Sequence, residues 1–265
     1  MNRPGHLGII AAMDEEFSLI AAAFGGGSMR KIGPREFFSA SHDGVKLTLV
    51  CSRIGKVAAA STATLLLHEF GCDALLFTGV AGGIDPAVGV GDVVAADALV
   101  QHDMDPKGVL GYKRFEIPLL GGPRLEACRY LTVIANEAAR VVVADPLYQS
   151  AVSEFCQRQP EHHSGVIASG DVFVCSHEER EDLRTSIPSL KCVEMEGAAV
   201  AQVCVEHDVP FSVVRIISDS ADSGAHIDFP RFIQSAAAVG SEMLVREFVR
   251  RVAGASSDRG PSRSA

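Results

Sequence analysis

The stretch LGIIAAMDEEFSLIAAAF, residues 7–24, places an uninterrupted apolar run directly before a segment with helical spacing. The apolar half predicts a strand buried on both faces, and the second half predicts a helix with one apolar side. A buried strand that leads at once into a helix is the repeating unit of sheets covered by helices. This stretch therefore predicts an α/β fold.

The same alternation continues along the chain. Further strands are predicted at residues 45–51, 74–79, 92–101, 164–170 and 211–218, and helices at 55–70, 123–141, 194–208 and 230–252. Strands of this kind predict one mixed, mostly parallel β-sheet flanked by helices. Since no repeat or linker divides the chain, we expect a single domain over residues 1–252 and a disordered tail over residues 253–265.

Composition excludes several classes of protein. A formal charge of −9 without a basic cluster argues against nucleic acid as a partner. We expect no membrane span, because no apolar run reaches the roughly 18 residues that a span requires. We also expect no signal peptide, because the N-terminus lacks its long apolar stretch and cleavage site, and hence a cytoplasmic protein. The seven cysteines form no CxxC pair, so reduced thiols are expected in place of disulfides or a metal site.

Unusual segments follow four of the predicted strands. They are MDEE (13–16), VAGG (80–83), DVFV (171–174) and DSAD (219–222). Each contributes a carboxylate, a glycine or an aromatic ring. Because ligands of open α/β sheets bind at the carboxyl ends of the strands, the four segments together predict a binding site there.

Glu16 is the carboxylate in the first of these segments with the most unusual expected environment. On a helical wheel it lies at the edge of the apolar stripe that contains Met13 and Phe17, whereas Asp14 and Glu15 point away from the stripe. Acidic residues in a first helical turn ordinarily complement the helix dipole, which suffices for Asp14 and Glu15. We expect Glu16 to be partly desolvated, with the raised pKa that suits a general base.

Arg215 interrupts an apolar strand, and a buried guanidinium needs a carboxylate or an anionic ligand. Two interpretations stay open: an ion pair with Glu194 or Glu16, or a contact with a ligand. Asp219 follows the same strand with Ser218 beside it. Both residue types also serve as ordinary caps and turn residues, so this pair is a candidate with an equally ordinary alternative.

Two further segments carry site candidates. VEMEGAAVA (193–201) opens an apolar segment with Glu194 and Glu196, and a buried charge is costly unless it is paired or hydrogen-bonded. Phe173 and Val174 follow a Gly-Asp turn. These two side chains could belong to the core, or could form a flat apolar wall for a planar ligand.

These segments carry a resemblance to a known family. The chain resembles the bacterial 5'-methylthioadenosine/S-adenosylhomocysteine nucleosidases, within the nucleoside phosphorylase-type fold. The matching segments, in order over about residues 7–250, are GIIAAMDEE, SRIGKVAAASTATLLL, FTGVAGGIDPAVGVGDVV, QHDMD, IASGDVFV, VEMEGAAVAQVC and VPFSVVRIISDSAD. The resemblance implies a nucleoside phosphorylase-like fold and hydrolysis of the N-glycosidic bond, which releases adenine and a thioribose without a metal or cofactor.

The resemblance also implies chemical roles. Cleavage of a purine–ribose bond passes through a sugar cation and needs a base for water and an acid for the departing purine. Glu16 matches the family's general base, and Asp219 matches the residue that protonates the purine at N7, with Ser218 alongside. Arg215 matches a residue that helps to hold the attacking water.

The substrate contacts implied by the resemblance fall on other residues. Glu196 matches the carboxylate that binds the ribose hydroxyls, and Met195 the residue that packs under the sugar. Phe173 and Val174 match the purine-binding wall. Ile54 matches a residue of the pocket for the 5'-substituent.

Two residues depart from the family pattern. Val80 stands where the family has a serine near the attacking water, and Val80 cannot form that hydrogen bond. Arg53 is added beside the expected site, where an arginine could bind phosphate, so a phosphate-dependent purine nucleoside phosphorylase stays an alternative. The acidic residues 14–16 favour hydrolysis, because they would repel phosphate.

The segment QHDMDPKGVLGYKRFEIP, residues 101–118, matches a loop that completes the neighbour's pocket in the family's dimer. Leu110 and Pro118 match its pocket-lining positions, so a symmetric homodimer is expected. The loop differs enough to leave the 5'-group open, and a hydrolase of another modified nucleoside such as aminofutalosine stays an alternative. So does a non-catalytic nucleoside-binding protein, which Glu16→Gln would impair little.

Overall fold

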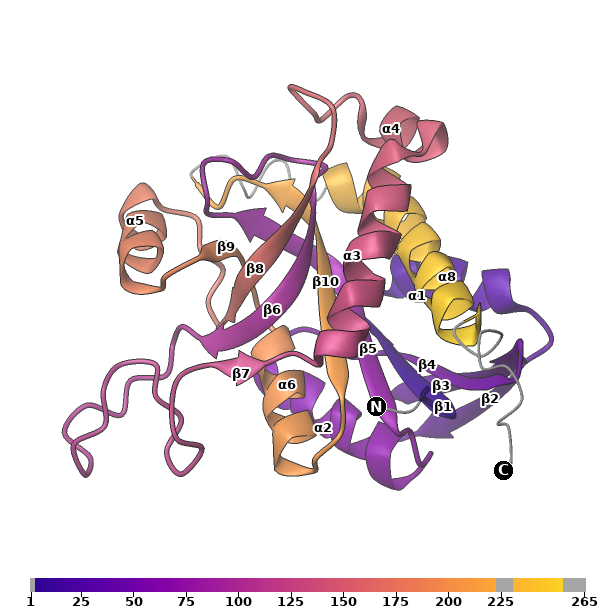
Figure 1. Cartoon of the computed structure of the whole chain (residues 1–265), viewed down its shortest axis with the longest axis horizontal. Helices are drawn as coiled ribbons and strands as arrows, with labels where there is room; N and C mark the ends of the chain where they lie inside the picture. The colour runs from indigo at the N-terminus through magenta and orange to yellow at the C-terminus, as the bar shows by residue number, and fades with distance from the viewer. Residues whose placement is uncertain (1–2, 223–230, 255–265) are drawn as a thin grey trace, which may run out of the picture.

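The computed structural model describes residues 3–222 and 231–254. Its strands are β1 (His6–Ala11), β2 (Ser28–Ile32), β3 (Arg35–His42), β4 (Val45–Cys51), β5 (Ala74–Gly83), β6 (Val93–Gln101), β7 (Leu125–Glu126), β8 (His162–Ser169), β9 (Leu190–Glu194) and β10 (Phe211–Asp219). They form one mixed sheet in the order β10-β6-β8-β9-β5-β1-β4-β3-β2, with β7 beside β6 (Figure 1). Because β10 also pairs with β5, the strands β10, β6, β8, β9 and β5 close into a ring.

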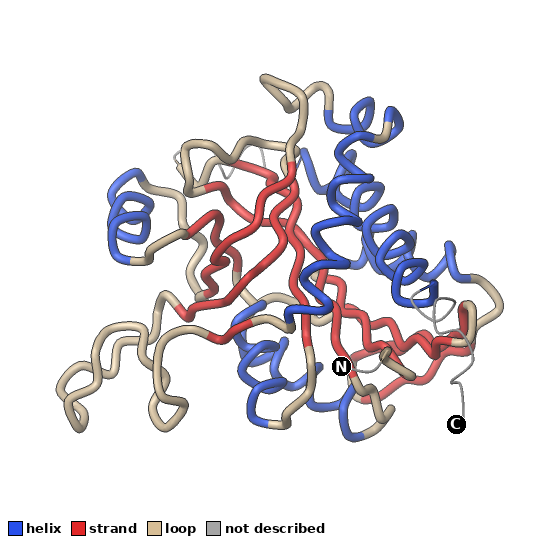
Figure 2. Tube along the Cα trace, viewed as in Figure 1, coloured by secondary structure: helices blue, strands red, loops and turns tan. Residues whose placement is uncertain are grey.

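Helices cover the sheet on both sides (Figure 2). They are α1 (Asp14–Phe24), α2 (Lys56–His68), α3 (Arg129–Ala144), α4 (Pro146–Val152), α5 (His177–Ser186), α6 (Gly197–Glu206), the π-helical segment η1 (Ile233–Ala237) and α8 (Ala238–Gly254). Helix α8 packs against α1 and α3 on one face, whereas α2 and α6 pack together on the other. Each layer encloses an apolar core, and every residue of β5 and β10 is buried between them.

The α/β fold with a mixed sheet is confirmed. Parallel pairing joins β4, β1, β5 and β10, and also β6, β8 and β9. Antiparallel pairing is more extensive than we expected, because the segment before β4 forms two further strands, β2 and β3, joined by tight turns. Among the described residues, no helix is both long and apolar enough to cross a bilayer.

Several predicted boundaries differ from the observed ones. Helix α3 begins at Arg129 and not at residue 123, because Leu125 and Glu126 pair with β6. Helix α6 begins at Gly197 and not at residue 194, because Glu194 ends a strand. Helix α8 continues to Gly254, two residues into the expected tail, and residues 255–265 lie outside the described part of the chain.

Candidate active site

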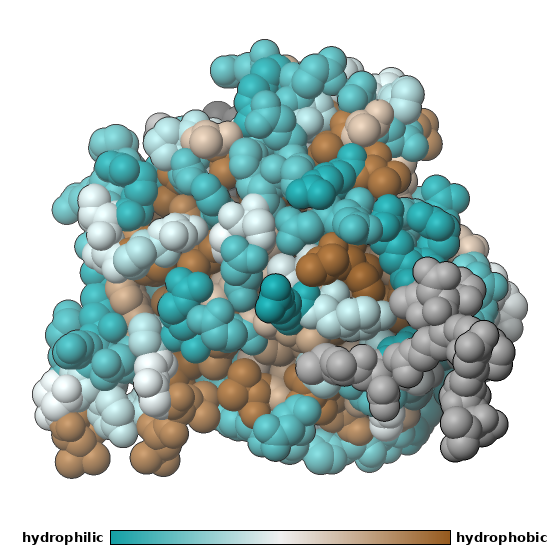
Figure 3. Space-filling model, viewed as in Figure 1, coloured by the Kyte–Doolittle hydropathy of each residue, from teal (hydrophilic) through white to brown (hydrophobic). Residues whose placement is uncertain are grey.

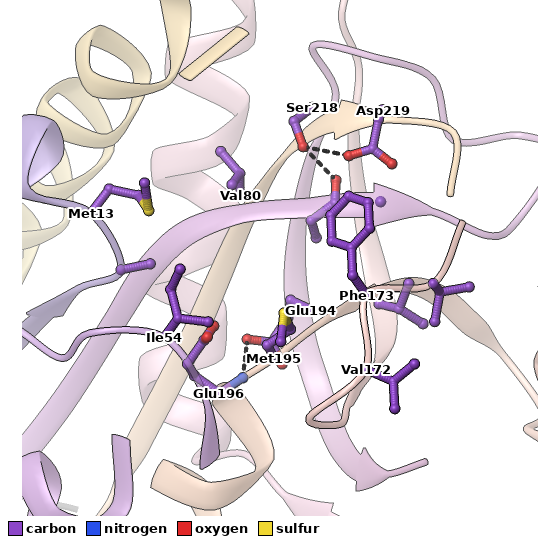
Figure 4. Close-up of a pocket in the computed structure, with 15 residues that line it drawn as sticks. Met13, Ile54, Val80, Val172, Phe173, Glu194, Met195, Glu196, Ser218 and Asp219 are labelled. Atoms are coloured by element: carbon purple, nitrogen blue, oxygen red, sulfur yellow. Dashed lines mark hydrogen bonds between the residues drawn. The ribbon is translucent and has the colours of Figure 1, made fainter. Parts of the chain in front are cut away.

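A cavity opens at the carboxyl ends of β1, β5 and β10, with about 600 Å³ of empty space that includes open solvent at its mouth (Figure 4). It is lined by Ala12, Met13, Ile54, Val80, Ala81, Gly82, Val172, Phe173, Val174, Val193, Glu194, Met195, Glu196, Ser218 and Asp219. The walls are mainly apolar, and the polar side chains are three carboxylates and one hydroxyl. Such a cavity suits a small molecule with an apolar body and a few polar groups.

The cavity brings together most of the residues that the sequence singled out. Those that line it are Ile54, Val80, Phe173, Val174, Met195, Glu196, Ser218 and Asp219. Four others do not line it: Glu16 and Arg215 are fully buried, whereas Leu110 and Pro118 lie in the loop between β6 and β7. The site is therefore built around the predicted substrate contacts, with two of the predicted catalytic residues set apart from the cavity.

Glu196 is held at the start of helix α6, with 6% of its surface exposed. Its Oε1 accepts a hydrogen bond of 2.9 Å from the backbone N–H of Gly55, the residue that precedes helix α2. The N-terminus of α2 thus stabilises the negative charge. Burial, reinforced by the nearby charge of Glu194, nevertheless raises the pKa of Glu196 to about 7. A hydrogen-bond donor or a positive charge in the cavity would favour the ionised form.

Glu194 forms a buried ion pair with Arg215. The carboxylate Oε2 lies 2.5 Å from Nη2 of the guanidinium, and it also accepts hydrogen bonds from the N–H groups of Glu196 and Gly197. Arg215 donates to the carbonyls of Phe77 and Val214, and its guanidinium lies over the ring of Phe77. Of the two carboxylates considered for Arg215, the structure therefore pairs it with Glu194.

Glu16 is completely buried behind the cavity wall. Its Oε2 accepts hydrogen bonds of 3.1 Å from the N–H groups of Ala12 and Met13, both of which line the cavity. Its Oε1 accepts one of 2.7 Å from the hydroxyl of Ser241. Burial raises the pKa of Glu16 against the opposing effects of these donors and of Arg215. The predicted desolvation and the predicted direction of the pKa shift are both confirmed.

Asp219 ends strand β10 with 2% of its surface exposed. The hydroxyl of Ser218 donates to Oδ2 over 2.8 Å, and the N–H of Ala221 donates to Oδ1 over 2.8 Å. Opposite it, Gly82 leaves the necessary space, because a Cβ at that position would lie 2.8 Å from Oδ1. The pairing of β10 with β5 therefore positions this carboxyl at the cavity.

The rim of the cavity is exposed and apolar. Ile54 is 61% exposed and Phe173 39% exposed, and Figure 4 shows both side chains bordering the open space. Leu110 is 92% exposed on the loop between β6 and β7, so it does not cover the cavity of its own chain. Of the two departures, Val80 lines the cavity, whereas Arg53 is exposed and does not.

Several other wall residues were given no individual role from the sequence, although most of them belong to the segments predicted to form the site. Ala12, Met13, Ala81, Gly82, Val172, Val193 and Glu194 also line the cavity. Each is close in sequence to a residue that was singled out, so a position at the end of a predicted strand indicates a residue of the cavity wall. Ser241 of helix α8, which contacts Glu16, gave no local signal, because it comes from the far end of the chain.

Comparisons with known proteins agree with this geometry. The pattern of the Phosphorylase superfamily matches residues 6–250. A 5'-methylthioadenosine/S-adenosylhomocysteine nucleosidase of Lysinibacillus sphaericus is 35% identical over 242 residues, which cover 91% of this chain and 97% of the relative.

Solved structures add to this agreement. The nucleosidase of the same name from Neisseria meningitidis, in complex with methylthio-immucillin-A, is 32% identical, with a TM-score of 0.82 and coverage of 93% of this chain and 99% of that one. The futalosine hydrolase of Helicobacter pylori is also 32% identical, with a TM-score of 0.79 and coverage of 93% and 97%. The chain belongs to the phosphorylase superfamily and, within it, to the family of 5'-methylthioadenosine/S-adenosylhomocysteine nucleosidases.

Proposed function

We propose that this protein hydrolyses the N-glycosidic bond of 5'-methylthioadenosine and S-adenosylhomocysteine, releasing adenine and the thioribose. The observation that carries the proposal is the position of Glu196 and Asp219 on one mainly apolar cavity. Glu196 would bind the ribose hydroxyls, and Asp219 would face the purine. The relatives named above support the same substrates.

In the proposed reaction, water attacks the anomeric carbon while the bond to the purine breaks. Glu16 takes a proton from the water, which must reach this carboxylate behind Ala12 and Met13, and the raised pKa of the buried group makes it a suitable base. The bonding electrons leave with the purine, and Asp219 supplies the proton that N7 takes up. Solvent then restores both residues to their starting protonation states.

The charge of the site favours water over phosphate as the nucleophile. Besides the proton donor Asp219, three carboxylates, those of Glu16, Glu194 and Glu196, lie at or behind the cavity wall, and one guanidinium, that of Arg215, is already paired. A phosphate anion would be repelled by this arrangement, whereas a cationic sugar would be stabilised. The exposure of Arg53 removes the main sequence argument for phosphate.

A homodimer is part of the proposal. The loop between β6 and β7 projects from the body, with apolar side chains at its tips (Figure 3). Val109 is 54% exposed, and Leu110 and Leu119 are each 92% exposed. Apolar side chains that protrude in this way favour a protein contact, and a second copy of this chain offers the exposed apolar rim of its cavity. We also propose a cytoplasmic location, where cysteine side chains would stay reduced.

A futalosine-type nucleoside is the second candidate substrate. The similarity to the futalosine hydrolase of Helicobacter pylori is nearly as high as to the nucleosidases. Ile54 and Phe173 at the rim are exposed in the single chain, so they do not limit the size of the group at the 5'-position.

The proposal is tested by measuring adenine release from methylthioadenosine, S-adenosylhomocysteine and aminofutalosine with the purified protein. We expect the first two to be cleaved with the higher kcat/KM, and Glu16→Gln to bind adenine with turnover reduced at least a hundredfold. A higher kcat/KM for aminofutalosine would make this nucleoside, and not methylthioadenosine or S-adenosylhomocysteine, the proposed substrate. A Glu16→Gln variant with full turnover would contradict the mechanism.

A further inference from the structure

The carboxylate of Glu16 makes contacts with two distant parts of the chain. Its Oε2 is bound by the N–H groups of Ala12 and Met13, within the same strand-to-helix junction. Among the residues that the structure describes, its Oε1 accepts a hydrogen bond only from a side chain of helix α8, the hydroxyl of Ser241, at 2.7 Å. The orientation of the carboxylate about its terminal bond thus depends on a residue more than 200 positions away in sequence.

Ser241 is itself held in a buried hydrogen-bond chain. Both Ser241 and Glu16 have no exposed surface, and Thr78 of β5, only 1% exposed, donates to the hydroxyl of Ser241 over 3.4 Å. With that donor in place, the proton of Ser241 is directed to Glu16. Along this series of hydrogen bonds, Thr78 donates to Ser241 and Ser241 donates to the carboxylate of Glu16.

Helix α8 can bring Ser241 this close because of the residue before it. A Cβ at Gly240 would lie 2.5 Å from the side chain of Ile216 in β10 and 2.7 Å from the ring of Tyr148. Gly240 therefore lets the helix lie closer to the sheet than a residue with a Cβ would allow.

The electrostatic consequence follows from the direction of the hydrogen bond. Ser241 donates to Glu16, so it stabilises the ionised carboxylate, as do Ala12 and Met13. Arg215 acts in the same sense from β10, and Cys51 of β4 lies within the field of Glu16 and Asp14. Burial acts in the opposite sense and outweighs the donors.

We propose that Ser241 is the positioning residue of the general base, which fixes the orientation of the Glu16 carboxylate and keeps it ionised at the pH at which it must accept a proton. This inference rests on the proposed function, because Glu16 must be the base. It adds that the C-terminal helix determines the acid limit of activity, although it contributes no residue to the cavity wall.

The test compares Ser241→Ala with Ser212→Ala. Ser212 is a matched control, since it is a buried serine on β10 whose hydroxyl has no partner within the described part of the chain. Removing one hydrogen bond to a carboxylate should move the acid limb of kcat/KM upward by about one pH unit, with a roughly tenfold loss below it and little change above it. Ser241→Cys, with a weaker donor, should shift the limb less.

A second readout does not depend on turnover. In protein labelled with ¹³C at the glutamate carboxyl groups, the signal absent from Glu16→Gln is that of Glu16, and its titration gives the pKa directly. We expect Ser241→Ala to raise this pKa and Ser212→Ala to leave it unchanged. If neither the titration nor the acid limb moves, or if both serine variants lose activity equally at every pH, the inference is overturned. A shifted titration in a protein that cleaves no nucleoside would remove the proposed function but leave the tuning of Glu16 by Ser241 in place.

Discussion

Glu194 and Arg215 form an ion pair of 2.5 Å in the interior of the protein, with Glu194 in the wall of the cavity and Arg215 behind it. Glu194 comes from the end of β9 and Arg215 from the middle of β10, so the pair joins two strands of the closed ring. The same carboxylate accepts the N–H groups at the start of α6 and so fixes the backbone of Glu196. The pair thus connects the sheet to the residue proposed to bind the ribose.

Glu194→Gln should destabilise the protein, because it leaves the charge of Arg215 buried without its counter-ion. A loss of about 3–5 kcal/mol in the free energy of unfolding is expected, measured by urea denaturation. Glu69→Gln is the control, since it removes one partner of the exposed pair with Arg30 and should cost less than about 1 kcal/mol. Equal losses for the two variants would show that the buried pair contributes no special stability.

Gly82→Ala should abolish activity while the fold persists. The new Cβ would lie 2.8 Å from Oδ1 of Asp219, so the proposed proton donor must move. Gly122→Ala provides the control, because nothing lies within 4 Å of a Cβ at that position. We expect kcat to fall at least a hundredfold for Gly82→Ala and to stay unchanged for Gly122→Ala. Full activity of Gly82→Ala would mean that Asp219 need not occupy its observed position.

Glu196→Gln should lose activity but gain stability at high pH. Because the pKa of Glu196 is raised to about 7, the stability linked to this group is fully present below its ordinary pKa of 4.5 and is lost as the pH rises through 7. Without ligand, the variant should therefore melt at a higher temperature than the natural protein at pH 8, with little difference at pH 5. If the difference in melting temperature between the variant and the natural protein is the same at pH 5 and pH 8, the raised pKa of Glu196 is contradicted.

Leu110→Asp tests the proposed dimer. Since Leu110 is 92% exposed, the change should not affect the folding of one chain, but it should weaken association and raise the KM for methylthioadenosine. Leu147→Asp is a matched control on helix α4, at a position that is 63% exposed. Sedimentation over a range of concentrations measures the association. A fully active monomer of the natural protein would refute the dimer.

Much of the fold could be predicted because its central strands are buried on both faces. The apolar runs of β1, β4, β5 and β10 gave a clear pattern, and the predicted bounds of α1 and β4 agree with the observed ones. Strand β2 escaped prediction because most of its residues are exposed, which leaves no apolar pattern. The hairpin of β3 and β4 had a usable signal in Asp43-Gly44, whose positive φ values suit a tight turn.

The site was predictable where the chemistry is local. Glu16 stood out by its place on a helical wheel, and the segments after the strands gave Phe173 and Asp219. Glu196 stood out as a carboxylate at the start of an apolar segment. The partner of Arg215 could not be chosen between Glu194 and Glu16, because both carboxylates are far from Arg215 in sequence. The contact of Ser241 with Glu16 was not visible for the same reason, since only the packing of α8 on α1 creates it.

The most direct test of the account is hydrolysis of methylthioadenosine in ¹⁸O-labelled water, with and without phosphate. We predict that adenine forms at the same rate in both cases and that the methylthioribose carries one ¹⁸O at the anomeric carbon. Formation of a sugar 1-phosphate, with adenine released only when phosphate is present, would contradict water as the nucleophile and return Arg53 to the site.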